Sequence, residues 1–425
     1  MERSFVVKGD FCYSLGKEEL ITRENAYLVC INGSVEGIYE TIPDRYRGLP
    51  LEDHSHKLII PGLVDMHVHA PQFPFRGLGM DKELMDWLWS YAFPEEGKYM
   101  DPDYARDAYR EFVRELRKSA TTRACIFGSR HVEATEILMD LLEESGLITF
   151  VGKVNMDRNA PDYLKETSAQ ASVDDTRYWL EKVRNRYRRV KPILTPRFVP
   201  SCTERLLEGL KEIQADYRIP VQSHLSESPG EISFVKELCP WASFYGEIYQ
   251  RYGLFGGPGC PTIMAHCVFS NEEEIALLKN NGVWVAHCPD SNMNISSGIA
   301  PIRKYLDGGL HLGLGTDIAG GSTLSLFRTM AQTIQLSKMY WRHIDPQYKA
   351  LNMKEVFYMA TLGGGEFWGN TGSFQKDFAF DAIVIQDDRI AGSRDRNLEE
   401  RLERVIYLAD DRNICAKYVA GEKLF

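Results

Sequence analysis

From residue 58 to residue 315, short apolar runs of strand length alternate with segments in which apolar residues recur every three or four positions. The first pattern predicts buried strands, and the second predicts amphipathic helices. The strand-like runs fall at residues 58–69, 122–127, 147–154, 193–199, 220–225, 262–268, 283–287 and 310–315. Helical spacing covers residues 104–116, 135–142, 176–186, 203–217 and 271–280. This alternation favours an α/β fold with a closed (β/α)8 barrel of the TIM type over an open, doubly wound sheet.

The two chain ends show short β-like runs of their own, such as those at residues 26–31, 379–386 and 405–408. A barrel of about 250 residues together with a second domain would account for the length of the chain. We therefore expect residues 1–57 and 370–425 to form one small, composite β-sandwich domain. The barrel itself would then consist of residues 58–369.

The charge balance disfavours some classes of partner. The chain has 50 lysine and arginine residues against 60 aspartate and glutamate residues, and it contains no long basic run. Nucleic acid and anionic membranes are therefore disfavoured as partners, and a small neutral molecule is favoured.

No apolar stretch reaches the roughly 18 residues that a membrane span needs, and residues 1–5 open a strand instead of a signal peptide. The nine cysteines include no Cys-x-x-Cys pair, so we expect scattered buried thiols in a cytoplasmic protein.

The most informative chemistry lies at the end of the first predicted barrel strand. This strand ends in His67 and His69. Alternate residues of a strand point to the same side, so the two imidazoles can share one metal ion. Barrels and related α/β folds carry their chemistry at the carboxyl ends of their strands. Taken alone, the pair is equally compatible with a structural or hydrogen-bonded role.

Ionisable side chains recur at the ends of later strands. His224 lies at the end of the fifth strand, His266 at the end of the sixth, and Asp317 just after the eighth. On a barrel these ends converge on one mouth, so four imidazoles and a carboxylate would come within reach of a single ion. Nitrogen and oxygen ligands suit Zn²⁺, and they suit Fe²⁺ or Mn²⁺ nearly as well. An open position on the ion would lower the pKa of a bound water to about 7, which predicts hydrolysis by a metal-bound hydroxide.

Glu227 lies three residues after His224, just past the same strand end. Its carboxyl group would face the ion across a substrate atom, and such acid–base catalysis contributes about 10²- to 10⁴-fold in rate. The alternative is that Glu227 caps the helix that follows Pro229. We favour the catalytic role because of the candidate metal ligands around this position.

Several segments together resemble a known family. The broader set is 61–69, 224–227, 287–292 and 315–317. In order and spacing these segments resemble the amidohydrolase superfamily, in its branch of metal-dependent aminohydrolases. Within that branch, three segments of the chain, residues 69–73, 87–95 and 197–200, are similar to the enzymes that deaminate guanine.

The resemblance implies a metal site with assigned ligands. It implies one Zn²⁺ per chain, with Fe²⁺ as the alternative. The ligands that it implies are His67, His69, His224 and Asp317. His266 would lie close to the ion or contact its water and the substrate, and Asp317 would take a proton from that water.

The resemblance also implies how a purine base is held and hydrolysed. Gln72 would bind a ring edge, Arg197 would bind the carbonyl oxygen remote from the reacting carbon, and Phe198 would contact the ring. His224 and Glu227 would line the same site. Glu227 would protonate the ring nitrogen beside the attacked carbon, so that guanine gives xanthine and ammonia in purine catabolism. A cytoplasmic homodimer is implied as well.

Other interpretations stay open at this level. Gln72 could be a surface or capping amide, and Arg197 could form an ordinary ion pair with an acid of a barrel loop. A related deaminase or chlorohydrolase acting on 8-oxoguanine, a pterin or a triazine would keep the same metal chemistry. A non-catalytic barrel that serves only binding is the alternative from another functional class.

Overall fold

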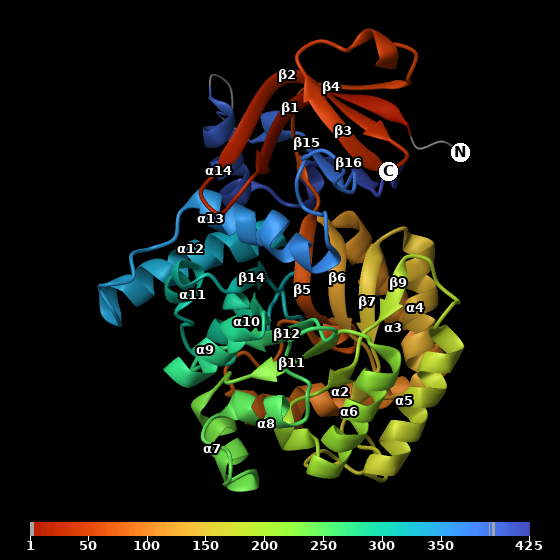
Figure 1. Cartoon of the computed structure of the whole chain (residues 1–425), viewed down its shortest axis with the longest axis vertical. Coiled ribbons are helices and arrows are strands. Elements are labelled where there is room, and N and C mark those ends of the chain that lie inside the picture. The colour runs from red at the N-terminus through yellow and green to blue at the C-terminus, as the bar shows by residue number, and fades with distance from the viewer. Residues whose placement is uncertain (1–3, 391, 393–395) are drawn as a thin grey trace.

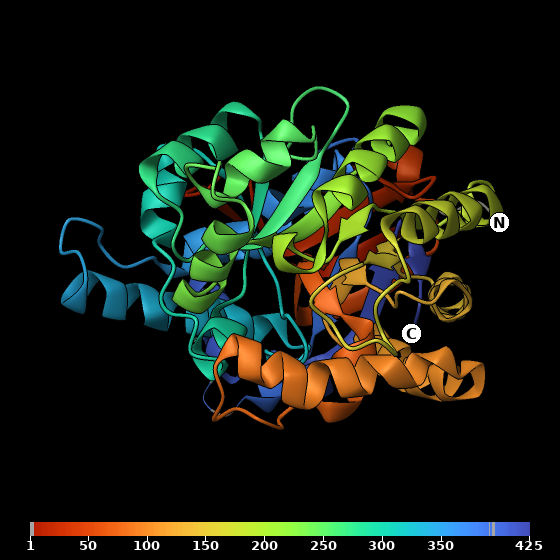
Figure 2. The same ribbon diagram turned by 90° about the horizontal axis from the view of Figure 1, so that it is seen from below.

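The computed structural model describes residues 4–390, 392 and 396–425. It contains an eight-stranded sheet, a seven-stranded sheet and one short pair of strands. In Figure 1 the seven-stranded sheet lies at the top of the molecule, above the strands of the eight-stranded sheet. Figure 2, seen from below, shows helices arranged around those central strands.

The eight-stranded sheet is the predicted barrel. Its neighbouring strands are parallel and follow the order β11-β12-β13-β14-β5-β6-β7-β9. A parallel bridge between Leu194 and Val221 joins the two outer strands and closes the barrel. The strands are β5 (Leu63–His69), β6 (Thr121–Phe127), β7 (Ile148–Gly152), β9 (Val190–Pro192), β11 (Val221–Leu225), β12 (Thr262–His266), β13 (Trp284–His287) and β14 (His311–Leu314).

The fourth barrel strand differs from the run predicted at residues 193–199. Its ladder ends at Pro192, and the next extended residues, Thr195–Pro196 (β10), pair with Val154–Asn155 (β8). Proline has no backbone N–H to donate, so the prolines that end β9 and β10 interrupt regular pairing. Leu194 still makes two backbone hydrogen bonds of 2.9 Å to the chain at the start of β11, which preserve the closure.

Helices connect the barrel strands and cover their outer side. The predicted helices correspond to α3 (Pro102–Lys118), α4 (Val132–Ser145), α5 (Ala169–Val183), α6 (Glu204–Tyr217) and α9 (Glu272–Asn280). The others are α1 (Leu84–Trp87), α2 (Phe93–Gly97), α7 (Pro229–Leu238), α8 (Tyr245–Arg251), α10 (Pro289–Asn294), α11 (Ile302–Gly308), α12 (Leu326–His343) and α13 (Met353–Tyr358). In α3, the Asp101 side chain accepts from the N–H of Asp103, and the buried face carries Tyr109, Phe112 and Leu116. This is the apolar face that the sequence pattern predicted.

Short helical turns complete the structure. Two are π-helical, η3 (Leu88–Ala92) and η6 (Met359–Gly363). The 3₁₀ turns are η1 (Asp44–Tyr46), η2 (Ala70–Phe75), η4 (Lys98–Met100), η5 (Val199–Ser201), η7 (Glu366–Trp368), η8 (Asp387–Arg389) and η9 (Asp411–Asn413). The turn η2 directly follows the end of barrel strand β5, and η5 follows the short strand Thr195–Pro196 after two residues.

The apolar run that the sequence predicted as one strand over residues 58–69 is divided between the two sheets. Residues up to Pro61 belong to β4 (Leu51–Pro61) and pair with β15 (Ala382–Ile385). The barrel strand β5 begins at Leu63. Gly62 lies at the division, where a Cβ atom would be only 2.2 Å from Thr122 Oγ1. The close approach of β6 therefore requires a glycine at this position.

Both chain ends contribute to the seven-stranded mixed sheet, as predicted. Its order is β17-β16-β15-β4-β1-β2-β3, and β1 pairs parallel with β4 but antiparallel with β2. The strands not yet given are β1 (Phe5–Ser14), β2 (Leu20–Ile31), β3 (Ser34–Tyr39), β16 (Ile414–Val419) and β17 (Glu422–Lys423). The runs predicted at residues 26–31 and 379–386 lie in or around β2 and β15.

The prediction of β structure at residues 405–408 is wrong. These residues form the last turn of helix α14 (Leu398–Leu408). Asn397 caps this helix in a capping box with Glu400, and the helix buries Leu402 and Val405 on one face. The cap and the spacing of three to four residues outweigh the β propensity of the short apolar run.

A cluster of buried charges, which we call the junction cluster, joins the mixed sheet to the barrel. It consists of Arg123, Asp381 and Lys417. Arg123 Nε donates to Asp381 Oδ2 at 2.6 Å, and Lys417 Nζ donates to the carbonyls of residues 117 and 119 at 3.0 and 2.9 Å. Those carbonyls lie at and just beyond the end of α3, where the helix dipole favours a cation. Arg123 and Asp381 neutralise each other, whereas burial lowers the pKa of Lys417 to about 7.

Two further observations concern partners and redox state. Across the described residues, no helix is both long enough and apolar enough to cross a membrane. Eight of the nine cysteines are buried and Cys415 is half-buried, and the described part of the chain contains no disulfide. The prediction of scattered buried thiols is confirmed.

Candidate active site

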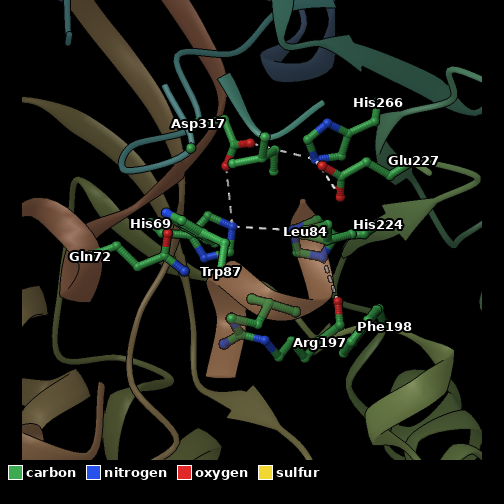
Figure 3. Close-up of a pocket in the computed structure, with 13 residues that line it drawn as sticks. His69, Gln72, Leu84, Trp87, Arg197, Phe198, His224, Glu227, His266 and Asp317 are labelled. Carbon is green, nitrogen blue, oxygen red and sulfur yellow. Dashed lines mark hydrogen bonds and ion pairs between the residues drawn. The ribbon is translucent and has the colours of Figure 1, made fainter. Parts of the chain in front are cut away.

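The predicted ligands converge at the carboxyl ends of the barrel strands. His67 and His69 end β5, His224 lies in β11, His266 ends β12, and Asp317 follows β14 by three residues. We call these five residues the mouth cluster. Figure 3 shows four of them around one pocket, with Glu227 beside His266 and Asp317. All five are buried.

The ligand atoms of the mouth cluster are spaced as a single ion requires. His69 Nε2 lies 3.2 Å from both His67 Nε2 and His224 Nε2. Asp317 Oδ1 lies 3.2 Å from His67 Nε2 and 3.5 Å from His69 Nε2. With bonds of about 2.1 Å, the ligand atoms of a tetrahedral ion lie roughly 3.4 Å apart. This donor set therefore fits one divalent ion.

Neighbouring groups fix the orientation of two ligands. His224 Nδ1 lies 2.6 Å from the backbone carbonyl of Arg197. A carbonyl can only accept, so Nδ1 carries the proton and the lone pair of Nε2 points into the mouth cluster. Buried Asp65 accepts from the Thr316 N–H at 3.0 Å and from the His67 N–H at 3.3 Å. It thereby ties β5 to the segment that leads to Asp317.

Charge and burial set the protonation of the ligands. Burial, together with the neighbouring imidazoles, holds the pKa of His69 and of His224 well below the usual value, so both rings are neutral. Burial opposes ionisation of Asp317, but the imidazoles of His67, His266 and His69 together outweigh it and bring the pKa of this carboxyl well below its ordinary value. Neutral imidazoles and an ionised carboxylate are the forms that bind metals.

Cys288 also lies within 4.8 Å of the ligand atoms of His67, His266 and Asp317. Burial raises the pKa of its thiol well above the ordinary value. Its Sγ donates to the carbonyl of Ala286 at 3.5 Å. The side chain packs in an apolar cluster inside the barrel, as the sequence pattern predicted.

His266 and Asp317 both hold strained backbone conformations. Their φ angles are +73° and +47°, in the left-handed region that residues other than glycine rarely adopt. Such strain clusters at functional sites, where surrounding structure enforces it. His266 Nδ1 lies 2.9 Å from Asn292 Oδ1, and its Nε2 lies 3.6 Å from Asp317 Oδ2.

Glu227 faces the mouth cluster and does not cap the helix after Pro229. Its Oε2 lies 3.5 Å from His266 Nε2, and its Oε1 accepts from Ser297 Oγ at 3.1 Å. The residue that caps α7 is Ser228, in a capping box with Glu231. Burial, and then the charge of Asp317, raises the pKa of Glu227 to about 8. The carboxyl group is therefore able to carry a proton near neutral pH.

Gln72 and Arg197 are brought together by a residue that sequence reasoning missed. Glu96 Oε1 accepts from Gln72 Nε2 at 2.8 Å, and its Oε2 accepts from Arg197 Nη1 at 2.5 Å. Gln72 Oε1 also accepts from the Ala319 N–H at 3.0 Å. Gln72 is therefore a buried amide and not a surface one, and the ion pair of Arg197 lies at the cavity. Glu96 directly follows the family-like segment 87–95, which is the only signal that pointed to it.

A pocket connects these groups. Four members of the mouth cluster, all except His67, line it together with Glu227, Gln72 and Arg197. Its apolar lining comes from Leu84, Trp87, Leu88, Phe198 and Ile295. Apolar walls with a few convergent polar groups are typical of small-molecule sites.

Known proteins are similar to this chain in sequence and in fold. Residues 58–424 match the model of the amidohydrolase family. The chain belongs to the amidohydrolase family. It is 37% identical over 382 residues to a guanine deaminase of Rattus norvegicus. The aligned region covers 87% of this chain and 83% of that relative. A guanine deaminase of Escherichia coli (strain K12) is 32% identical over 417 residues, covering 95% of this chain and 91% of that relative.

A solved structure extends the similarity to three dimensions. It is the crystal structure of guanine deaminase from C. acetobutylicum with bound guanine in the active site. It matches this amidohydrolase with a TM-score of 0.96 and 45% identity, and the match covers 99% of this chain and 100% of that one. The predicted family and the predicted barrel are both confirmed.

Proposed function

We propose that this amidohydrolase is a guanine deaminase, which hydrolyses guanine to xanthine and ammonia. One observation carries the proposal: most of the candidate metal ligands line the same pocket as Glu227 and as Gln72 and Arg197, the side chains expected to bind a purine. The similar protein with guanine bound in its active site supports the choice of base. The apolar walls would contact the faces of the purine ring.

The metal would be held by His67, His69, His224 and Asp317. Zinc is the first candidate for this set of nitrogen and oxygen donors, and iron is the second. Bound there, the ion supplies Lewis-acid chemistry that makes a water nucleophilic at neutral pH. The ring of His266, oriented by Asn292, would hold that water toward the substrate.

Two carboxyl groups would move the protons. Asp317 is ionised, so it accepts the proton that the attacking water loses. Glu227 carries a proton near neutral pH and gives it to the ring nitrogen beside the attacked carbon. The new C–O bond makes this carbon tetrahedral. The proton held by Asp317 then passes to the exocyclic amino group, and the C–N bond breaks to release ammonia. As it breaks, the hydroxyl group on that carbon returns its proton to the Glu227 carboxylate and becomes the carbonyl of xanthine.

Gln72 and Arg197 would select the base. A side-chain amide offers two N–H groups and one carbonyl, and Gln72 uses one N–H for Glu96 and its oxygen for Ala319. Its second N–H and the second lone pair of its oxygen stay available for a purine edge. Arg197 uses Nη1 for Glu96, so the other guanidinium N–H groups can donate to the carbonyl oxygen of guanine.

The test is ammonia release by metal-analysed enzyme from guanine, 8-oxoguanine, adenine, cytosine, pterin and melamine. We expect fast turnover of guanine with about one zinc or iron per chain, because a single set of four ligands is present. Adenine and melamine lack the carbonyl oxygen for Arg197 and should be inert. Turnover of another base with guanine inert would refute the purine-binding roles but leave the metal chemistry in place.

Assembly is a separate proposal. The homodimer implied by the resemblance stays a prediction, which light scattering of the purified protein in solution would check. A mass of one chain would contradict it without affecting the proposed chemistry.

A further inference from the structure

Helix α8 carries two buried tyrosines one turn apart. The rings of Tyr245 and Tyr249 are stacked, with centroids 5.9 Å apart and planes 11° apart. Residues at positions i and i+4 lie on one face of a helix, so both hydroxyls point the same way. Burial raises the pKa of both hydroxyls well above the ordinary value, so both keep their protons and can donate. Burying a hydroxyl costs free energy unless it is hydrogen-bonded, so the partners of the two tyrosines matter.

The Tyr249 hydroxyl lies beside the strand end that carries a metal ligand. It donates to the backbone carbonyl of His224 at 3.1 Å and lies 2.8 Å from Ser223 Oγ. Ser223 Oγ in turn lies within hydrogen-bonding distance of the backbone carbonyl of Pro196, at 2.7 Å. The contact between Ser223 and Pro196 and the hydrogen bond from His224 Nδ1 to the carbonyl of Arg197 together join β11 to the residues that follow β9.

The Tyr245 hydroxyl is linked through Glu231 to the backbone of Glu227. It accepts from the Val199 N–H at 3.3 Å and donates to Glu231 Oε1 at 2.9 Å. Glu231 Oε2 accepts from the Glu227 N–H at 2.8 Å. A path of three hydrogen bonds therefore joins the backbone beside Phe198 to the backbone of Glu227.

The two tyrosines thus connect two segments that the reaction must hold in register. The substrate segment, residues 196–199, carries Arg197 and Phe198. The catalytic segment, residues 223–231, carries His224 and Glu227. A base bound by Arg197 is protonated by Glu227 only if the distance between these segments is correct. A misplacement of about 1 Å can cost about 10²-fold in rate.

We propose that Tyr245 and Tyr249 are positioning residues, whose hydroxyls set the distance between the substrate segment and the catalytic segment. The proposal rests on the proposed deaminase function. It adds that catalysis depends on a helix whose side chains do not line the cavity. The hydroxyls act through Glu231 and through the backbone, and they make no contact with the reacting atoms.

The kinetic test compares Tyr245→Phe and Tyr249→Phe with Tyr252→Phe as the matched control. Each change removes one hydroxyl group, and Tyr252 follows the last residue of α8, outside both hydrogen-bonded paths. We expect kcat to fall roughly 10-fold in the first two variants, with KM changed less than about 3-fold and the metal content unchanged. The control should keep the wild-type kcat. A role in stability alone would instead lower Tm and leave kcat per folded molecule intact, which would overturn the proposal.

A second measurement tests the link without relying on turnover. Hydrogen–deuterium exchange of the Val199 and Glu227 amides should accelerate in Tyr245→Phe, because both amides lie on its path. Exchange of these amides should stay at the wild-type rate in Tyr252→Phe. Unchanged exchange in Tyr245→Phe would overturn the proposal whatever base the enzyme accepts. If wild-type enzyme leaves guanine intact, the proposed function fails, and the kinetic comparison is made on the base that it does deaminate.

Discussion

Two buried groups of ionisable side chains, one between the mixed sheet and the barrel and one at the barrel mouth, are built on opposite principles. In the junction cluster, a guanidinium meets a carboxylate at 2.6 Å, and Lys417 donates to backbone carbonyls. In the mouth cluster, imidazole nitrogens lie 3.2 Å from one another, and His266 and Asp317 hold φ angles of +73° and +47°. The junction is complementary as it stands, whereas the mouth requires an additional positive charge among its ligands.

The difference shows how one fold separates stability from chemistry. Conserved function at the carboxyl ends of barrel strands and structural roles at the opposite end are general features of this architecture. Buried partners at the junction hold the mixed sheet against the barrel. Strain and facing donor atoms at the mouth cost stability, and binding of an ion there would offset that cost. We therefore expect substitutions in the junction cluster to lower stability, and substitutions in the mouth cluster to lower metal content or activity.

The largest effect should follow the loss of a mouth ligand. Asp317→Ala removes the only anionic ligand and the group that accepts the water proton, so both metal and activity should be lost. Elemental analysis and ammonia release from guanine would measure the two losses together. Retained metal with a wild-type rate would contradict the ligand assignment.

Glu227→Gln should separate chemistry from metal binding within the mouth. Glutamine keeps the size of the side chain and its bond to Ser297 but cannot give up a proton. We expect kcat to fall about 10²- to 10⁴-fold while the metal content stays at the wild-type level. A wild-type kcat in this variant would refute the proton transfer and would be consistent with a barrel that does not use Glu227.

Arg197→Ala tests recognition at the same end. The variant loses the donor to the guanine carbonyl and leaves Glu96 without its cation, so kcat/KM for guanine should fall about 10²-fold or more. The metal content should not change, because the Arg197 side chain is not a ligand. Unchanged kcat/KM would show that this guanidinium serves only its ion pair.

Arg123→Met tests the junction. It leaves Asp381 buried without its cation, which should lower the free energy of unfolding by about 3–5 kcal/mol. Urea unfolding measures this loss, and kcat per folded molecule should stay within about 2-fold of wild type, because the site lies at the other end of the barrel.

A matched double variant sharpens the same test. Asp381→Asn removes the unpaired charge but keeps an acceptor for the Ala420 N–H. Combined with Arg123→Met, it should recover part of the lost stability, because an uncompensated buried charge costs more than a neutral pair. No recovery would show that the ion pair is not the source of the effect.

The smallest effect should come from a histidine near the mouth but outside the cluster. His131 precedes α4, and burial, and then Arg130, lowers its pKa to about 4. The unfolded chain therefore binds a proton between about pH 6.5 and pH 4 that the folded protein does not. Stability from this group is present above pH 6.5 and is lost as the pH falls. His131→Gln should weaken that pH dependence in urea unfolding, with metal content and kcat unchanged; loss of metal would place His131 among the ligands.

Local sequence patterns predicted much of this fold. The period of apolar residues predicted the barrel, and the positions of His67, His69 and His224 at strand ends predicted one shared site. Both inferences work because alternation along a strand and convergence at a barrel mouth follow from backbone geometry. Short apolar runs were less informative, since residues 405–408 continue a capped helix instead of forming a strand.

The sequence by itself determined the barrel, the family and the candidate ligands. Only the tertiary structure decided that Glu96 joins Gln72 to Arg197, across 24 and 101 residues of chain. Likewise, only the fold divides one apolar run between two sheets at Gly62, because the nearby Thr122 leaves no room for a Cβ atom. Side-chain periodicity is local and can be recognised along the chain. The partner of a buried polar group depends on contacts between distant segments, which exist only once the chain has folded.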